Sequence, residues 1–274
     1  MFFPTNPLIG DNIALSSYFK NNDVETVKTN SQRYLHNVKR LVTHLETRAL
    51  PALLPQILIN NYHSKQVALT PLQHAVVVGG LLGDLHIQKT TASTQRCRLR
   101  VCHNIAQRDY VDRKYAALKE PFCKGVKPPH ETARPGEYVF YTMYRDEFLP
   151  YRDEWYRDNG SGLRKRVPNT IDTLLVDPIS LAVWYLDDGT KRNDSDACRL
   201  ATQGFSLQEN KALSNCLWTN FAIHASIDTW ILARAREPLY GLSIQSKSGG
   251  YKRVSQLIHN FVRAEVPTML YKLK

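Results

Sequence analysis

Two acidic residues, Asp84 and Asp188, each stand at the end of an apolar segment with helical character. The carboxyl end of a helix carries the negative pole of its dipole, so an acid is disfavoured there unless a cation lies nearby. Two such helices packed side by side would bring the two carboxylates close together. Hard oxygen ligands suit Mg²⁺, and paired metal ions beside a phosphodiester promote its hydrolysis. The two acids therefore predict a metal-dependent phosphodiesterase site.

Two further pairs of residues recur with nearly the same spacing as the acids, which are 104 positions apart. His103 and Gln203 each close a predicted strand and are 100 positions apart, and Lys165 and Lys272 are 107 apart. A lysine beside a scissile phosphate can stabilise charge in the transition state. A Gln or His at a strand end can orient an attacking water. The repetition predicts a pseudo-symmetric pair of units, each with one set of these groups.

The predicted elements that position these residues also occur twice. In the first unit they are a helix from Thr70-Pro71 to about residue 84, a strand at 96–103 and a helix at 109–118. In the second they are a helix from Asp177-Pro178, a strand at 198–203 and a helix at 206–221. Thr and Asp are favoured helix N-caps, and Pro suits the first turn. Further strands are predicted at 137–148, 230–235 and 242–245, and a closing helix at 254–262.

Glycines on the first of these helices indicate how the two units meet. Gly79 and Gly83 are spaced i, i+4 and so lie on one helix face. Val183 and Asp187 occupy the same positions on the second helix. Because a glycine lets another backbone approach closely, the spacing predicts that the two helices pack against each other.

The composition limits the classes of protein that this chain can represent. It has 274 residues, 43% of them apolar, and 36 Lys and Arg against 25 Asp and Glu, a net charge of +11. Wholesale disorder is excluded, and the longest apolar stretch, residues 75–83, is too short to span a membrane. Five cysteines without a CxxC pair argue against a disulfide scaffold or a zinc ribbon, and the first residues lack the basic region of a signal or transit peptide. We therefore expect an intracellular protein of a reducing compartment with a polyanionic partner, most simply nucleic acid.

Two segments of the sequence resemble the signature helices of the LAGLIDADG homing endonucleases. They are VVGGLLGDL at 77–85 and LAVWYLDDG at 181–189, the first with Leu85 where the family usually has Gly. The segments LRKRVP, RLATQGFS and VPTMLYKL also resemble the single-chain, two-repeat branch of that family. The resemblance covers about residues 68–274 and leaves the first 67 residues unexplained.

The resemblance implies a mixed α+β fold of two pseudo-symmetric αββαββα repeats. Each repeat would carry a saddle-shaped antiparallel sheet, and the paired LAGLIDADG helices would join the repeats. The expected organisation is an N-terminal helical extension at 1–67, a first repeat at 68–160 and a second at 161–274. The implied function is site-specific cleavage of both strands of a long asymmetric DNA target. The implied reaction depends on Mg²⁺ (or Mn²⁺), leaves 3′ overhangs and is carried out by a monomer.

The resemblance also implies roles for six residues at the centre of the molecule. Asp84 and Asp188 would bind metal, Lys165 and Lys272 would be the active-site lysines, Gln203 would position the attacking water, and His103 would take that place in the first repeat, where Gln is more usual. Asp187 is expected on the helix interface and is not expected to bind metal.

Cationic residues on predicted strands indicate a DNA-binding surface. Arg96, Arg98 and Arg100 alternate with apolar residues and therefore share one face. A two-stranded β-ribbon fits the major groove, where Arg can read guanine. In the second repeat the residues in phase are Arg234 with Arg236 and Gln245 with Lys247. Four more cations are expected to contact phosphates and so to position the protein without reading sequence: Lys191, Arg192, Lys252 and Arg253.

Three other functions remain open at this point. The segment Tyr185-Leu186-Asp187-Asp188 fits the Tyr-x-Asp-Asp pattern of reverse transcriptases, although there the acids lie in a hairpin turn. Proteins that resemble this family also act as RNA maturases, so the RNA of a host intron is a second candidate ligand for the same basic surface. A DNA-binding module without cleavage activity is the third. An origin in an organellar intron, mitochondrial or chloroplast, would fit both the nuclease and the maturase.

Overall fold

The computed structural model describes residues 68–90, 96–160, 162–231 and 238–273. These residues belong to one compact unit, Gln66–Lys274. The predicted helical extension at 1–67 lies outside the described residues. None of the helices in the described part is both long enough and apolar enough to cross a membrane.

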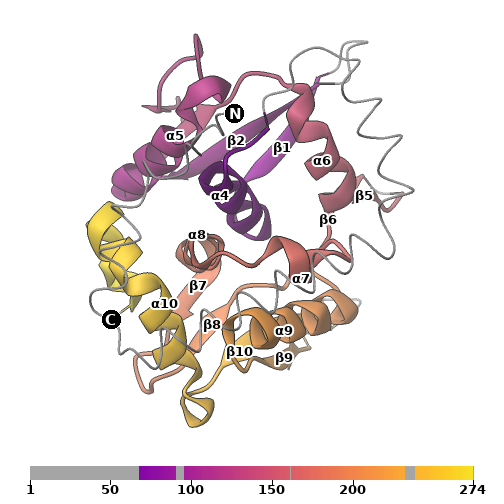
Figure 1. The fold of residues 1–274 in the computed structure, drawn as a ribbon, viewed down its shortest axis with the longest axis vertical. Coiled ribbons are helices and arrows are strands. Elements are labelled where there is room, and N and C mark those ends of the chain that lie inside the picture. Colours follow the sequence, from indigo (N-terminus) through magenta and orange to yellow (C-terminus); the bar gives the residue numbers. More distant parts are fainter. Residues whose placement is uncertain (1–67, 91–95, 161, 232–237, 274) are drawn as a thin grey trace, which may run out of the picture. The chain divides into compact units, whose positions relative to one another are not determined.

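The first half of this unit alternates helices with pairs of strands (Figure 1). Its elements are α4 (Pro71–Leu82), β1 (His86–Lys89), β2 (Cys97–Asn104), α5 (Arg108–Phe122), β3 (His130–Glu131), β4 (Glu137–Tyr141), α6 (Leu149–Trp155), β5 (Tyr156–Asp158) and β6 (Leu163–Lys165). The elements of the second half are α7 (Ile171–Leu174), α8 (Pro178–Asp188), β7 (Gly189–Lys191), β8 (Cys198–Leu200), α9 (Leu207–Phe221), β9 (Ser226–Trp230), β10 (Leu239–Ile244), α10 (Gly250–Glu265) and a final 3₁₀ segment, η5 (Pro267–Leu273).

The two halves have the same sheet topology. One four-stranded antiparallel sheet has the order β1-β2-β4-β3 and the other has the order β7-β8-β10-β9. With α4, α5 and α6 in the first half and α8, α9 and α10 in the second, each half follows the order αββαββα. The predicted pair of repeats is therefore confirmed.

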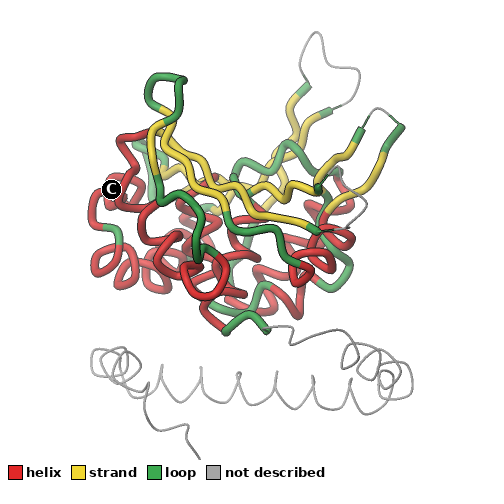
Figure 2. The backbone as a smooth tube through the Cα atoms, turned by 90° about the horizontal axis from the view of Figure 1, so that it is seen from above, coloured by secondary structure: helices red, strands yellow, loops and turns green. Residues whose placement is uncertain are grey.

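The helices form one layer and the strands another (Figure 2). Alternation along β2 explains the division, because Cys97, Leu99 and Val101 are buried while Arg98 and Arg100 remain partly exposed. The apolar side of the sheet therefore faces the helices, and the arginines lie on the other side. The predicted phase of the arginines is confirmed for Arg98 and Arg100.

Helices α4 and α8 pack against each other at the centre of the unit (Figure 1). Thr70 caps α4 in a capping box with Gln73, and the Asp177 side chain caps α8. A Cβ atom on Gly79 would overlap the backbone of Ser180, and one on Gly83 would overlap Asp187. Any larger residue at either glycine would push the two helices apart.

Four details differ from the sequence-based expectation. The strand predicted at 198–203 is β8, which ends at Leu200. Residues 137–148 contain one strand, β4, followed by the 3₁₀ turn η3 (Asp146–Phe148), and the partners of β4 are β2 and β3. The strand predicted at 230–235 is β9, which ends at Trp230, and residues 232–237 lie outside the described part. The predicted boundary between residues 160 and 161 falls inside the β5–β6 hairpin, because the two strands of that hairpin pair across it.

Candidate active site

The two predicted metal-binding acids lie where the central helices end. Helix α8 ends at Asp188, and Asp84 follows the last turn of α4. Contact between the helices joins these ends, since Asp187 Oδ2 accepts a hydrogen bond from the backbone N–H of Asp84 at 3.0 Å. The Tyr185–Asp188 segment is helical and does not form a hairpin turn. That geometry removes the resemblance to a reverse transcriptase.

Both acids are held in their neutral form more strongly than an exposed aspartate. Burial, followed by repulsion from Asp187 and Asp84, raises the pKa of Asp188 to about 7. Burial, followed by repulsion from Asp187, also raises the pKa of Asp84. Carboxylates crowded in this way are costly to ionise unless a cation joins them.

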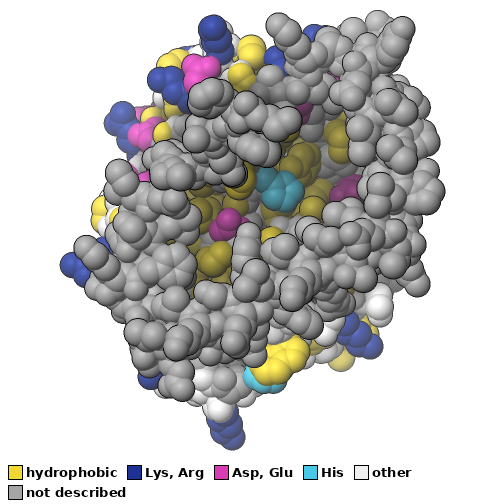
Figure 3. All heavy atoms as spheres, viewed as in Figure 1, with side chains coloured by type: hydrophobic (Ala, Val, Ile, Leu, Met, Phe, Trp, Pro, Cys, Tyr) yellow, Lys and Arg dark blue, Asp and Glu magenta, His cyan; other side chains and the backbone are white. Residues whose placement is uncertain are grey.

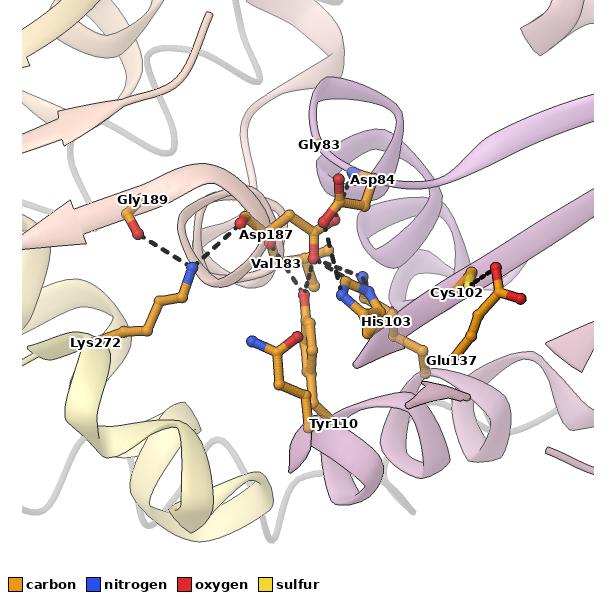
Figure 4. Close-up of polar contacts among 12 residues, drawn as sticks. Gly83, Asp84, Cys102, His103, Tyr110, Glu137, Val183, Asp187, Gly189 and Lys272 are labelled. Atoms are coloured by element: carbon orange, nitrogen blue, oxygen red, sulfur yellow. Dashed lines mark hydrogen bonds and ion pairs between the residues drawn. The ribbon is translucent and has the colours of Figure 1, made fainter. Parts of the chain in front are cut away.

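Each of the two predicted lysines reaches the end of one of these helices. Lys165, the last residue of β6, donates from Nζ to Gly83 O at 2.5 Å. Lys272, in η5, donates to the backbone oxygens of Asp187 and Gly189, both at 3.2 Å (Figure 4). Burial lowers the pKa of Lys165 to about 8 and also lowers the pKa of Lys272. Each ammonium neutralises carbonyls at the negative end of one helix.

Beside Asp84 the structure contains a polar cluster that sequence reasoning missed in part. The side chain of Asp187 is 0% exposed, and its Oδ1 lies 2.7 Å from Lys114 Nζ and 2.6 Å from the Tyr110 hydroxyl. His103 lies between Asp84 and Asp187 (Figure 4). Its Nδ1 is 3.6 Å from Asp84 Oδ2, and its Nε2 is 3.7 Å from Asp187 Oδ1. We call Asp187, Lys114, Tyr110 and His103 the α5–α8 cluster.

The charges in this cluster are balanced within it. Burial alone raises the pKa of Asp187, but Lys114, His103 and the hydrogen bonds from Lys114 and Tyr110 together lower it below its usual value. Burial, followed by the charge of Lys114, lowers the pKa of His103 to about 4, so the imidazole is neutral at physiological pH. The expectation that Asp187 lies on the helix interface is confirmed.

The position of Lys114 on the apolar face of a helix is a sequence signal for a buried lysine, but such a position is also common for lysines that reach solvent. Lys114 lies in phase with the buried residues Tyr110, Val111, Ala117 and Leu118 on the apolar face of α5. A lysine on such a face commonly extends its ammonium to solvent. Here its side chain is 1% exposed, because Asp187 reaches it from the other repeat.

The strand register changes the expected match between His103 and Gln203. His86, two residues after Asp84, pairs with Arg100, and Thr190, two residues after Asp188, pairs with Arg199. Arg100 and Arg199 are therefore counterparts. Three residues after them stand His103 and Thr202, and four residues after them stand Asn104 and Gln203, so these are the matching pairs. Gln203 and Asn104 are both exposed, whereas His103 and Thr202 are buried. His103 therefore faces the helices, on the opposite side of the strand from the position that matches Gln203.

The site contains donors that fit a divalent cation. Asp84, His103 and Asp187 each offer an atom within 4.8 Å of the others. Asp187 Oδ1 is already bound to Lys114 and Tyr110, which leaves the two raised-pKa carboxylates, Asp84 and Asp188, as the available anionic ligands. Hard carboxylate oxygens beside a solvent-exposed edge suit Mg²⁺ or Mn²⁺.

Comparison with known proteins identifies the family. Residues 74–262 match the LAGLIDADG DNA endonuclease family. The chain belongs to this family. Its fold resembles that of the homing endonuclease I-WcaI, solved bound to its DNA recognition sequence, with a TM-score of 0.61, 21% identity and coverage of 79% of this chain and 92% of that one.

Curated relatives include proteins with two kinds of name. The probable intron-encoded endonuclease 1 of Wickerhamomyces canadensis is 22% identical over 79% of this chain and 90% of its own length. The cytochrome b mRNA maturase bI2 of Saccharomyces cerevisiae is 26% identical over 56% of this chain and 37% of its own length. For several curated relatives, the match spans only 30% to 37% of their length.

The strand surface of this LAGLIDADG protein carries arginines held by neighbouring side chains. Arg98 donates to Gln88 at 3.0 Å, and its guanidinium lies 4.2 Å from the ring centre of Tyr141 and 4.8 Å from that of Tyr144. Arg100 forms an ion pair of 2.7 Å with Glu137. These contacts restrain each guanidinium on the sheet before any ligand arrives.

Arg96 and Arg199 extend this surface in the two repeats. Arg96 is exposed and pairs with Asp146 at 3.2 Å. Arg199, which sequence reasoning missed, is the register counterpart of Arg100 and pairs with Asp228 at 3.4 Å. The helix side of the molecule, seen in Figure 3, shows its visible described Lys and Arg side chains around the edge of the view.

The other predicted DNA contacts of this LAGLIDADG protein lie in varied settings. Lys191 folds back onto the backbone oxygens of Arg192 and Ser195, and Arg192 pairs with Asp194 at 2.5 Å. Gln245 and Lys247 are exposed just after β10. Lys252 and Arg253 lie on α10, in the helix layer, and Arg253 donates to Phe221 O. Arg234 and Arg236 lie outside the described residues.

Proposed function

We propose that this protein is a site-specific homing endonuclease that cleaves both strands of a long asymmetric DNA target by hydrolysis, as a monomer, and leaves 3′ overhangs. The observation that carries the proposal is that Asp84 and Asp188 stand at the ends of α4 and α8, that these ends are in contact through Asp187 and the backbone N–H of Asp84, and that one lysine reaches each helix end. Two sets of groups related by a pseudo-twofold suit a substrate with two antiparallel strands. The name of the family and those of intron-encoded relatives support the same reaction.

The proposed cofactor is Mg²⁺ or Mn²⁺, held by Asp84 and Asp188. The raised pKa values of these carboxylates fit a site whose charge balance a bound cation completes. A bound divalent cation would supply Lewis-acid stabilisation of the phosphate oxygens. Asp187 is excluded as a ligand in this proposal because its carboxylate neutralises Lys114.

The remaining groups of the site act on the phosphate and on water. Lys165 and Lys272 place ammonium groups beside the acids, where they stabilise negative charge that develops on the scissile phosphate. Gln203 is exposed in the turn that follows β8, and its amide can orient a water molecule. Arg98, Arg100 and Arg199 provide base-reading or phosphate-binding groups on the strand surface. Gln245 and Lys247, exposed just after β10, are proposed to read bases in the second repeat, and Lys191 and Arg192 to contact phosphates. Lys252 lies on α10 in the helix layer and has no part in this proposal.

RNA maturation is the second candidate function. It is supported by the names of two relatives, the cytochrome b mRNA maturases bI2 of Saccharomyces cerevisiae and Debaryomyces hansenii, the latter 36% identical over 32% of this chain. The same names support a host intron in an organelle. A variant with both Asp84 and Asp188 changed to Asn distinguishes the two functions. It should lose DNA cleavage and retain any role in splicing.

The decisive experiment is cleavage selection from a randomised duplex library with the purified full chain and Mg²⁺. We expect recovery of one long asymmetric target cut on both strands, and Asp188→Asn should recover none while it still binds the selected target. Recovery of no cleaved DNA with the wild-type protein, or normal cleavage by Asp188→Asn, would overturn the proposal. Omission of Mg²⁺ with EDTA present is the matched control.

A further inference from the structure

The buried lysine of the α5–α8 cluster has no counterpart in the second repeat. Helices α5 and α9 have the same length and begin 99 positions apart, the same offset that relates Arg100 to Arg199. Lys114 therefore corresponds to Leu213, which is 0% exposed. An ammonium in a position that suits leucine loses its hydration, so its partners must replace that hydration.

The partners of Lys114 determine which nitrogen of His103 carries the proton. Lys114 Nζ lies 2.7 Å from Asp187 Oδ1 and 3.1 Å from His103 Nε2. An ammonium can only donate hydrogen bonds, so Nε2 must accept with its lone pair. A neutral imidazole has one N–H, which is therefore on Nδ1. Nδ1 faces the carboxylate of Asp84, whose Oδ2 is 3.6 Å away and whose side chain is 49% exposed.

We propose that Lys114 is a positioning residue that fixes the Nδ1–H tautomer of His103 and thereby turns a hydrogen-bond donor toward Asp84. The proposal rests on the proposed function for the role of Asp84, but the tautomer itself does not depend on cleavage. A donor behind a metal-binding carboxylate fixes the direction in which the other oxygen points. The separation of 3.6 Å is slightly longer than a hydrogen bond, and such contacts commonly tighten when the substrate complex forms.

The second repeat lacks this device. Thr202, the counterpart of His103, donates its hydroxyl to Asn210 at 2.5 Å and does not reach Asp188 in any contact among the described residues. The two half-sites therefore orient their acids by different means. This arrangement also joins the two repeats. Asp187 of the second repeat holds Lys114, which acts through His103 on Asp84 of the first repeat.

The tautomer can be measured without metal or DNA. Long-range ¹H–¹⁵N correlation spectra of the full chain with ¹⁵N-labelled histidine distinguish Nδ1–H from Nε2–H, and His103→Asn assigns the signal by its loss. We expect Nδ1–H for His103 in the wild type. We expect a gain of the Nε2–H form in Lys114→Met/Asp187→Asn, in which the buried charges are removed together so that neither is left unpaired. Leu213→Met is the matched control and should leave the signal unchanged. Nε2–H in the wild type would overturn the proposal.

Two substitutions of His103 test its effect on Asp84 while leaving the Lys114–Asp187 pair in place. The amide nitrogen of Asn can occupy the position of Nδ1, whereas the longer Gln places its amide near the position of Nε2. The assay uses a duplex with each strand labelled. His103→Asn should cut the strand served by Asp84 at a rate within about threefold of the wild-type rate, and His103→Gln should cut that strand about 10–100-fold more slowly than the wild type. The other strand should be cut at the wild-type rate in both variants.

Equal rates for the two variants, or faster cleavage by His103→Gln, would overturn the inferred effect of His103 on Asp84. The strand that Asp84 serves is identified by the loss of its cleavage in Asp84→Asn. If the wild-type protein cuts no DNA, the proposed function fails, and the NMR measurement still decides whether Lys114 sets the tautomer.

Discussion

The two repeats share one topology and build different surroundings for their acids. In the first, Asp84 lies beside His103, and the buried pair of Lys114 and Asp187 lies directly behind that histidine. In the second, the position of Lys114 is taken by the apolar Leu213, and a hydrogen bond between Thr202 and Asn210 replaces the histidine.

This difference follows from the joining of two repeats in a single chain. A symmetric dimer must place the same residue on both sides of its axis, because each subunit has the same sequence. Here the last position before the acid is Gly83 on one helix and Asp187 on the other, and the missing side chain of Gly83 provides the space that Asp187 fills. One glycine and one aspartate thus meet at a single contact, and the buried pair of Asp187 and Lys114 lies beside the acid of the first repeat.

The largest effect is expected from removing either acid. Asp84→Asn and Asp188→Asn should each reduce double-strand cleavage on the order of 10³-fold, since the remaining carboxylate cannot replace the lost charge. DNA binding should change by less than about threefold, because phosphate contacts dominate affinity. Strand-resolved cleavage assays with the two variants side by side measure both repeats. Equal loss on both strands from each variant would show that the two half-sites act as one unit.

The second effect concerns stability and contrasts Lys114 with Leu213. Lys114→Met should lower the free energy of unfolding by about 3–5 kcal/mol, because Asp187 would remain charged and unpaired in the interior. Leu213→Met, the same residue at the matching position, should cost less than about 1.5 kcal/mol. Urea denaturation of the full chain measures both. Similar values for the two variants would mean that the Lys114–Asp187 pair carries no net stabilisation.

A third effect separates the lysines. Lys272→Met and Lys165→Met should each slow cleavage about 10–10²-fold on one strand more than on the other, because each ammonium caps only one helix end. Single-turnover nicking of each labelled strand gives the two rates for each variant. Arg in place of either lysine keeps the charge and serves as the control. Equal slowing of both strands by one variant would contradict two separate half-sites.

The sequence predicted the central helices well because their signals are local. Thr70 and Asp177 mark where α4 and α8 begin, and the spacing of Gly79 and Gly83 predicted their close contact. The acids at the helix ends and the two lysines were also found from the sequence, since each belongs to a repeated pattern. The structure places all four at the adjoining ends of α4 and α8.

The sequence could not give the strand register or the partner of a buried charge. A spacing of 100 paired His103 with Gln203, but the ladders show an offset of 99, and one residue of slip moves a side chain to the other face of a strand. Lys114 was missed for a different reason. Its burial depends on Asp187, which is 73 positions away and belongs to the other repeat, so no local pattern contains it.

The smallest effect tests the acids through the pH dependence of stability. Because the pKa of Asp188 is raised to about 7, the folded protein keeps a proton between about pH 4 and pH 7 that the unfolded chain releases. Stability without metal should therefore fall as pH rises through that window, and Asp188→Asn should abolish this part of the fall. Between pH 5 and pH 8, the free energy of unfolding of the variant should rise by about 1–2 kcal/mol relative to that of the wild type. This value is smaller than the full pKa shift of Asp188 would give, because the side chain is partly exposed.

Urea denaturation in EDTA at several pH values measures this gain, with Leu213→Met as a control in which the titrating groups are unchanged. Asp84→Asn should give a gain of the same sign, since burial and Asp187 also raise the pKa of Asp84. Addition of Mg²⁺ should remove most of the difference from the wild type at pH 8, because a cation stabilises the ionised carboxylates. The opposite result would be a wild-type protein that becomes more stable than Asp188→Asn as pH rises in EDTA. It would mean that Lys165 and Lys272 already compensate the charge of the acids. In that case neither half-site would need a cation to stay folded.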